Sequence, residues 1–256
     1  MAELHVIQDR GGFARTERRD SWWAEIIPVI IVLGGFGAYA TFRAFEGAFY
    51  QCWDLGLPYL SPFYSPLIDP QHHWWKFSPA LLILAGPLGF RATCYYYRKA
   101  YYRAFFLDPP SCAVNDLGHR SYKGETAFPL VLQNIHRYFF YLALVFLAFL
   151  WYDAVLSFDW NGRFGIGMGS LVMLTNVILL SLYSFSCHSW RHLIGGKLDC
   201  FSCSASAKAR HSGWKLTSSL NENHMLFAWL SLFSVGLTDF YIRLVSSGAI
   251  TDIKIL

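Results

Sequence analysis

The sequence predicts an all-α membrane protein in which residues 1–256 form one domain, a bundle of five transmembrane helices. Hydrophobic residues make up 54% of the chain and charged residues only 15%, against roughly 25% charged residues in an average soluble domain. Five apolar stretches and an uneven distribution of basic residues support the same class. The composition argues against a soluble enzyme or a disordered chain, and a net charge of +4 does not indicate a nucleic-acid partner.

The five predicted helices follow from stretches of about 20 mostly apolar residues, the length needed to cross a bilayer. They cover residues 24–42, 77–97, 128–152, 164–187 and 224–245. The pair Trp22–Trp23 before the first stretch is typical of the aromatic belt at a membrane interface. Proline interrupts the first two stretches and a glycine-rich run opens the fourth, which bundles in lipid tolerate. No internal repeat is apparent in the sequence.

Lysine and arginine predict the orientation of the bundle. If the N-terminus is cytoplasmic, the inner segments hold 16 of these residues and the outer segments hold 5. Cytoplasmic loops of membrane proteins carry such an excess. We therefore expect the N-terminus inside and the C-terminus outside. The polar, basic N-terminal segment has no apolar run or cleavage site, so no signal peptide is expected.

Histidine and cysteine gather at the predicted cytoplasmic side, which holds seven of the nine histidines and five of the six cysteines. Ionisable groups at a membrane edge are costly unless they bind a ligand or find partners. Thiolates beside imidazoles favour an iron or iron–sulfur centre over magnesium or calcium. His188 and His192 are four residues apart, so one helix face would present both rings to one metal ion.

A second group of candidate ligands follows in the next loop. Cys200 and Cys203 form a Cys-x-x-Cys motif with histidines nearby, a moderate indicator of a structural zinc site. The residues alone leave open a redox centre, a zinc-stabilised loop in a non-redox membrane protein, or reduced thiols. On the outer side, the proline-rich segment 47–75 is expected to form an ordered cap, and Asp239 and Arg243 an i,i+4 ion pair.

Several segments resemble the membrane anchors of a divergent class of succinate dehydrogenase, in its mycobacterial and actinobacterial form. The segments are RATCYYYRKAYYR (91–103), DPPSC (108–112), QNIHRY (133–138), CHSWRH (187–192) and LTDFY (237–241). The resemblance runs from about residue 87 to residue 245. It implies a multi-pass subunit of respiratory complex II in the bacterial inner membrane, in contact with membrane lipid. Its partners would be a flavoprotein subunit, which oxidises succinate, and an iron–sulfur subunit.

The resemblance also implies the cofactor. Anchors of better-known classes hold haem b between histidines, whereas this class is thought to use a Rieske-type [2Fe–2S] centre. Such a centre has two cysteines on one iron and two histidines on the other. We expect His188 and His192 as the histidine ligands. We expect Cys94 and Cys112 as the cysteine ligands, with Cys200 and Cys203 as the alternative pair.

The anchor is also expected to host the reduction of menaquinone or ubiquinone, which needs a hydrogen-bonding site with access to protons. The candidates near the inner interface are Arg91, Tyr95, His136 and Arg137. If the cofactor is haem b, its ligands would be His136 with His188 or His224. The basic loops 98–125 and 193–223 are expected to dock the iron–sulfur subunit. Without a flavin- or dicarboxylate-binding pattern, the chain alone should not oxidise succinate.

Overall fold

A computed structural model describes residues 21–68, 77–105 and 130–256, and most of these residues are helical. The helices are α1 (Trp22–Glu46), α2 (Pro79–Thr93), α3 (Tyr95–Phe105), α4 (His136–Leu156), α5 (Met168–Phe185), α6 (His188–Gly195), α7 (Ala205–Glu222) and α8 (His224–Ser246). The shorter elements are η1 (Trp53–Leu55), η2 (Pro62–Tyr64), η4 (Leu130–Ile135) and the hairpin of β1 (Asp159–Trp160) and β2 (Arg163–Phe164). The predicted all-helical class is therefore confirmed apart from one small hairpin.

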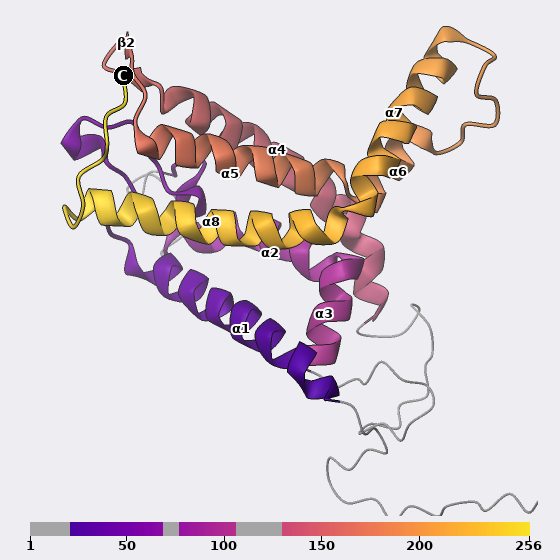
Figure 1. Cartoon of the computed structure of the whole chain (residues 1–256), viewed down its shortest axis with the longest axis horizontal. Coiled ribbons are helices and arrows are strands. Elements are labelled where there is room, and N and C mark those ends of the chain that lie inside the picture. The colour runs from indigo at the N-terminus through magenta and orange to yellow at the C-terminus, as the bar shows by residue number, and fades with distance from the viewer. Residues whose placement is uncertain (1–20, 69–76, 106–129) are drawn as a thin grey trace, which may run out of the picture.

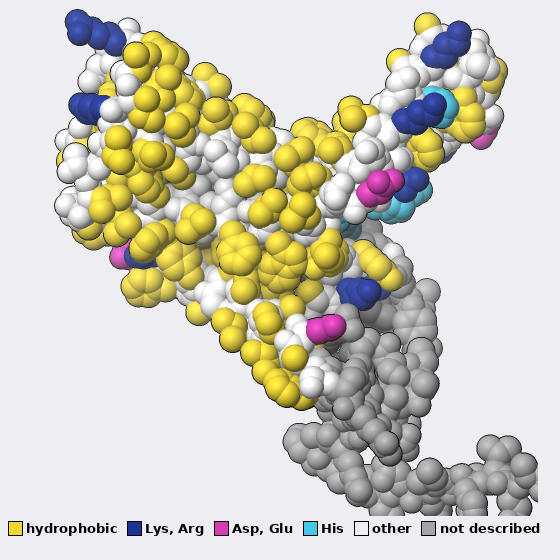
Figure 2. Space-filling model, viewed as in Figure 1, with side chains coloured by type: hydrophobic (Ala, Val, Ile, Leu, Met, Phe, Trp, Pro, Cys, Tyr) yellow, Lys and Arg dark blue, Asp and Glu magenta, His cyan; other side chains and the backbone are white. Residues whose placement is uncertain are grey.

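Four helical segments in the described part of the chain are long and apolar enough to cross a membrane. They are Trp23–Glu46, Val131–Leu156, Met168–Phe185 and His224–Ser246. The remaining predicted span, residues 77–97, contains α2 of only 15 residues, because the chain becomes extended at Cys94 and then starts α3. Apolar side chains cover the helical body on the face shown in Figure 2, and charged side chains lie mainly at its ends. The predicted orientation stays a prediction.

The bundle is built around α2, α4, α5 and α8, which run side by side, while α1 lies obliquely across one side (Figure 1). The main packing pairs are α5 with α8, α2 with α4, and α4 with α5. At the other end from the C-terminus, α6 and α7 project as a hairpin (Figure 1). We call this end of the bundle the hairpin end. It carries a buried cluster around Phe90, Cys94, Phe140, Tyr183 and Cys187.

The opposite end is closed by the segment between α1 and α2. Tyr59, Phe63 and Tyr64 of this segment are buried, and Tyr64 stacks on Tyr50 with ring centres 4.1 Å apart. The Tyr59 hydroxyl donates a hydrogen bond of 2.7 Å to Asp252 near the C-terminus. The predicted cap is therefore confirmed for residues 47–68, while residues 69–75 lie outside the described part.

The predicted pair of Asp239 and Arg243 is present, but it belongs to a larger buried network. Arg243 Nε lies 2.9 Å from Asp239 Oδ2, and Arg243 Nη1 lies 2.8 Å from Glu46 Oε2. Asp239 also accepts hydrogen bonds from the hydroxyls of Tyr39 and Ser61. Asp239 is 0% exposed and Arg243 is 3% exposed. The network therefore ties α1, α8 and the cap together inside the protein.

Gly169 allows the start of α5 to approach the cap closely. A Cβ atom at this position would overlap the Tyr59 ring, which is fully buried and held by its hydrogen bond to Asp252. We therefore expect Gly169→Ala to lower the free energy of unfolding by about 1–3 kcal/mol, measured by thermal or denaturant unfolding of the purified protein. Gly34→Ala in α1 is the control, because a Cβ there meets open space. An equal decrease of the free energy of unfolding in Gly169→Ala and Gly34→Ala would contradict this explanation.

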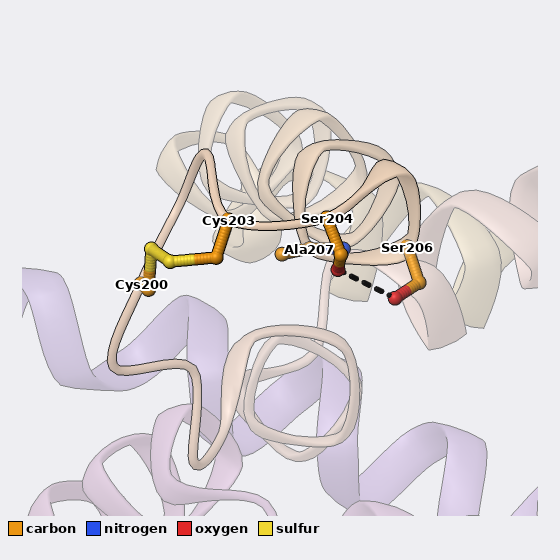
Figure 3. Close-up of a disulfide and its surroundings, with 5 residues drawn as sticks. All are labelled: Cys200, Cys203, Ser204, Ser206 and Ala207. Atoms are coloured by element: carbon orange, nitrogen blue, oxygen red, sulfur yellow. Dashed lines mark hydrogen bonds between the residues drawn. A yellow bond between two sulfur atoms is a disulfide. The ribbon is translucent and has the colours of Figure 1, made fainter.

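The hairpin of α6 and α7 differs from the sequence expectation at its tip. Cys200 and Cys203 form a disulfide just before Ser204, whose hydroxyl is hydrogen-bonded to that of Ser206 (Figure 3). The Ser204 side chain also caps α7 by accepting a hydrogen bond from the Ala207 amide. Their Cα atoms are 5.8 Å apart, a normal separation for a disulfide. The motif is therefore neither a zinc site nor a pair of reduced thiols here, because each sulfur is bonded to the other.

Candidate metal centre

Two helices end in the same way at the hairpin end of the bundle. α2 ends with Thr93 followed by Cys94, and Ser186 followed by Cys187 comes directly after α5. Both cysteines have extended backbones, with φ −65° and ψ 131° for Cys94 and φ −66° and ψ 143° for Cys187. Each cysteine carbonyl then accepts the first hydrogen bond of the next helix, α3 or α6. Both sulfurs therefore lie at helix N-termini, where the backbone amides favour negative charge.

The hydroxyl before Cys94 orients the first histidine of α4. Thr93 Oγ1 donates its proton to the carbonyl of Gly89 at 2.7 Å and lies 2.8 Å from His136 Nδ1. A hydroxyl has one proton, so this arrangement is satisfied when Nδ1 of His136 carries a proton and donates it to Thr93. The lone pair of Nε2 is then free, and it faces Cys187 Sγ at 3.1 Å.

The hydroxyl before Cys187 does the same for the first histidine of α8. Ser186 Oγ donates to the carbonyl of Tyr183 at 3.0 Å and lies 2.7 Å from His224 Nδ1. By the same reasoning, Nδ1 of His224 donates to Ser186 and the Nε2 lone pair is free. That nitrogen lies 3.5 Å from Cys94 Sγ.

An aromatic ring holds each imidazole in place. Phe90 stacks on His136 with ring centres 4.9 Å apart, and Tyr183 stacks on His224 with ring centres 5.1 Å apart. Each ring stands three residues before the orienting hydroxyl, which ends α2 at Thr93 and directly follows α5 at Ser186. We call α2 with α4 one half of the bundle and α5 with α8 the other half. Both halves thus contain the same local arrangement of aromatic ring, hydroxyl, cysteine and histidine. No repeat is apparent in the sequence, because the ring and hydroxyl residues differ and the chain between cysteine and histidine differs in length.

Together these residues form what we call the thiol–imidazole cluster: Cys94, His136, Cys187 and His224. His136 interacts electrostatically with His224 and also with His188 of α6, and the two thiols interact with each other. Cys94 and Cys187 are 3% and 2% exposed. Four different segments of the chain therefore bring two soft sulfur ligands and two imidazole nitrogens to one buried place.

The donor set consists of two cysteine sulfurs and two imidazole nitrogens. Among the described residues, no group of three or more His, Cys, Asp or Glu side chains is arranged to hold one metal ion. A Rieske-type [2Fe–2S] centre takes two thiolates on one iron and two imidazoles on the other. The fully buried Tyr183 hydroxyl lies within hydrogen-bonding reach of the Cys94 sulfur.

The metal ligands predicted from the sequence lie partly elsewhere. His188 and His192 share one face of α6 as predicted, with ring centres 4.4 Å apart. Burial lowers the pKa of His188, and the neighbouring His192 and Arg191 lower it further. Cys112 lies outside the described residues, and Cys94 belongs to the thiol–imidazole cluster. Whether His188 and His192 bind a metal therefore stays a prediction.

The predicted quinone-binding residues differ in their surroundings. Arg91 and His136 are engaged by neighbouring helices, whereas Tyr95 is 67% exposed and Arg137 is exposed. All four lie near the hairpin end, close to the thiol–imidazole cluster. Cys187, His136 and His224 are not among the iron–sulfur ligands predicted from the sequence, although the structure places them beside each other and Cys94. The signal that points to them is the recurrence of a hydroxyl residue followed by cysteine at two predicted helix ends.

Comparisons with known proteins agree with the resemblance noted in the sequence. The family model described as "Actinobacterial succinate dehydrogenase subunit SdhC" matches residues 24–248. A chain of the Mycobacterium smegmatis Sdh1 complex, solved in the apo form, is 44% identical to this chain. The match has a TM-score of 0.81 and covers 94% of each chain. A search of curated proteins found no match.

Proposed function

This chain belongs to the actinobacterial family of succinate dehydrogenase SdhC membrane subunits, and from that premise we propose that it carries electrons from the soluble iron–sulfur subunit to quinone through a Rieske-type [2Fe–2S] centre. The observation that carries this proposal is the thiol–imidazole cluster. It contains two cysteines and two histidines with free Nε2 lone pairs, which is the ligand set of a Rieske-type centre. A centre of this kind supplies one-electron transfer at a potential raised toward that of quinones.

The proposed ligands are Cys94 and Cys187 on one iron and His136 and His224 on the other. The repeated arrangement relates the two cysteines to each other and the two histidines to each other. Each iron would therefore receive a matched pair of ligands, one from each half of the bundle. Thr93 and Ser186 would keep the imidazoles oriented through Nδ1, which is how hydrogen bonds to the second ring nitrogen support metal ligands.

The geometry favours this assignment over haem b held by His136 together with either His188 or His224. Axial imidazoles of a haem face each other across the iron, whereas Nε2 of His136 and Nε2 of His224 each face a thiol. Haem b also makes no use of two buried cysteines. A non-redox protein with a zinc-stabilised loop loses its support because Cys200 and Cys203 are bonded to each other.

The remaining parts of the proposal concern quinone and partner subunits. Among the predicted quinone-binding residues, Tyr95 and Arg137 are exposed at the hairpin end and free to contact menaquinone or ubiquinone.

The projecting hairpin of α6 and α7 carries Lys197, Lys208, Arg210 and Lys215. We expect this basic hairpin to dock an acidic face of the iron–sulfur subunit, which in turn binds the flavoprotein subunit. The hairpin end would then face the cytoplasm.

The test is an EPR spectrum of the dithionite-reduced complex, together with its content of iron and acid-labile sulfide. We expect a Rieske-type signal in addition to the signals of the soluble iron–sulfur subunit. The same preparation without the SdhC-type subunit is the control and should lack that signal. Active complex without this signal, or with a haem absorption band in its place, would disprove the proposal.

A further inference from the structure

Arg91 fixes a positive charge between α2 and α8 at the hairpin end. Its Nη1 donates to the Tyr97 hydroxyl at 2.5 Å and to the Ala228 carbonyl at 3.2 Å. Its Nη2 donates to Ser231 Oγ at 3.0 Å. Tyr97, Ala228 and Ser231 are all buried. These three partners leave the guanidinium little freedom to move away from this position.

This charge lies directly beside the thiol–imidazole cluster. The guanidinium carbon of Arg91 is 4.7 Å from the centre of the Tyr183 ring, and that ring stacks on His224. Arg91 also interacts electrostatically with both Cys94 and His224. The charge is therefore close enough to act on a metal centre held by these residues.

No carboxylate compensates the charge of Arg91 in the described part of the chain. Its partners are a phenol, a carbonyl and a hydroxyl, all of them neutral. Arg43 and Arg243, at the opposite end of the bundle, both pair with Glu46 instead. Arg91 is partly buried and its hydrogen-bond partners are buried, so its charge acts more strongly on its neighbours than a charge in water.

Arg91 has no counterpart on the Cys187 side of the thiol–imidazole cluster. It stands three residues before Cys94, and the equivalent position before Cys187 is occupied by Ser184. Ser184 is buried and neutral. The local arrangement of ring, hydroxyl, cysteine and histidine is complete without Arg91, so the repeated geometry does not require the charge.

We propose that Arg91 raises the reduction potential of the iron–sulfur centre by stabilising the negative charge that reduction adds, an inference that rests on the function proposed above. With two thiolates, two neutral imidazoles and two sulfides, the diferric centre is neutral. One electron from the soluble iron–sulfur subunit converts one ferric iron to ferrous and leaves one net negative charge. Arg91 is thus a positioning residue that favours the reduced state and touches neither substrate nor iron.

The experiment is an EPR-monitored redox titration of the purified complex carrying Arg91→Gln. We expect the reduced state to be at least tenfold less favoured than in the wild type, which for a one-electron couple is a midpoint about 59 mV lower. Arg91→Lys keeps the charge and should recover most of the potential. Ser231→Asp places a carboxylate beside Arg91 and should lower the potential while Arg91 is retained.

Two control variants separate the charge from other effects. Ser231→Ala removes one hydrogen bond to Arg91 but no charge, and Arg163→Gln removes an exposed charge on β2. Both should leave the potential unchanged, and a shift equal to that of Arg91→Gln in either would overturn the inference. An unchanged potential in Arg91→Gln with a raised KM for quinone would overturn it too, and would make Arg91 a quinone-binding residue. Absence of the Rieske-type signal in the wild type would instead overturn the proposed function, and this inference with it.

Discussion

A variant with both His136→Ala and His224→Ala is expected to lose the Rieske-type EPR signal and quinone reduction together. The two substitutions remove both imidazole nitrogens that face the cysteines, so one iron would have no protein ligands. Succinate oxidation measured with a soluble artificial electron acceptor should be unchanged, because that reaction needs only the soluble subunits. The measurements are the EPR spectrum and both activities on the same preparation.

A smaller change should give a graded result. Thr93→Val removes only the hydroxyl that orients His136 through Nδ1. Loss of such a supporting hydrogen bond weakens metal binding by about 10–100-fold. We therefore expect partial occupancy of the centre, measured as iron and sulfide content per complex, with quinone reduction lowered in proportion.

The control is the double variant His188→Ala and His192→Ala, which removes the pair first predicted from the sequence. We expect it to keep the EPR signal, because both rings lie on α6 outside the thiol–imidazole cluster. If the signal is instead lost in this variant and retained when His136 and His224 are replaced, the ligands predicted from the sequence are right. The assignment from the structure is then wrong.

Arg243→Met is expected to destabilise the protein by about 3–5 kcal/mol, because it leaves a buried charge without its partner. Arg243 contacts Asp239, which is fully buried, and also Glu46 and the carbonyl of Ala48. Truncating one member of a buried ion pair costs more than the pair contributes, since the other charge stays out of water. The measurement is thermal or denaturant unfolding of the complex in detergent.

Two further variants test this explanation. Tyr39→Phe removes one hydrogen bond to Asp239 and should cost only about 1–3 kcal/mol. Combining Arg243→Met with Asp239→Asn removes both charges of the pair and should recover part of the loss. If the destabilisation of the combined variant equals the sum of those of Arg243→Met alone and Asp239→Asn alone, the unpaired charge is not the cause.

The sequence predicted the helical membrane class and four of the five spans, because long apolar stretches report burial in lipid without any tertiary information. The second span was overestimated. Residues 77–97 are mostly apolar, with Arg91 as their one charged residue, yet the helix ends at Thr93 and Cys94 is extended. No proline or glycine stands at that break, so local composition gives no warning of it. The same holds for the break at Cys187.

Sequence patterns and helix packing point to the same end of the bundle but to different ligands, and which set binds a metal stays a prediction. His188 and His192 were chosen because helical spacing places both on one face, and the structure confirms that they share it. His136 and His224 are distant from each other in the chain, and no periodicity relates them. Only packing shows that each meets a cysteine from the other half of the bundle.

The sequence by itself determined the membrane class, the family resemblance, and the gathering of cysteine and histidine at one side. These properties follow from composition, from local segments and from the charge of the loops. The tertiary structure alone decided which thiol meets which imidazole and where Arg91 places its charge. The physical reason is that these contacts join residues brought together by helix packing. Such contacts depend on where α2 and α5 end and on how α4 and α8 begin beside them.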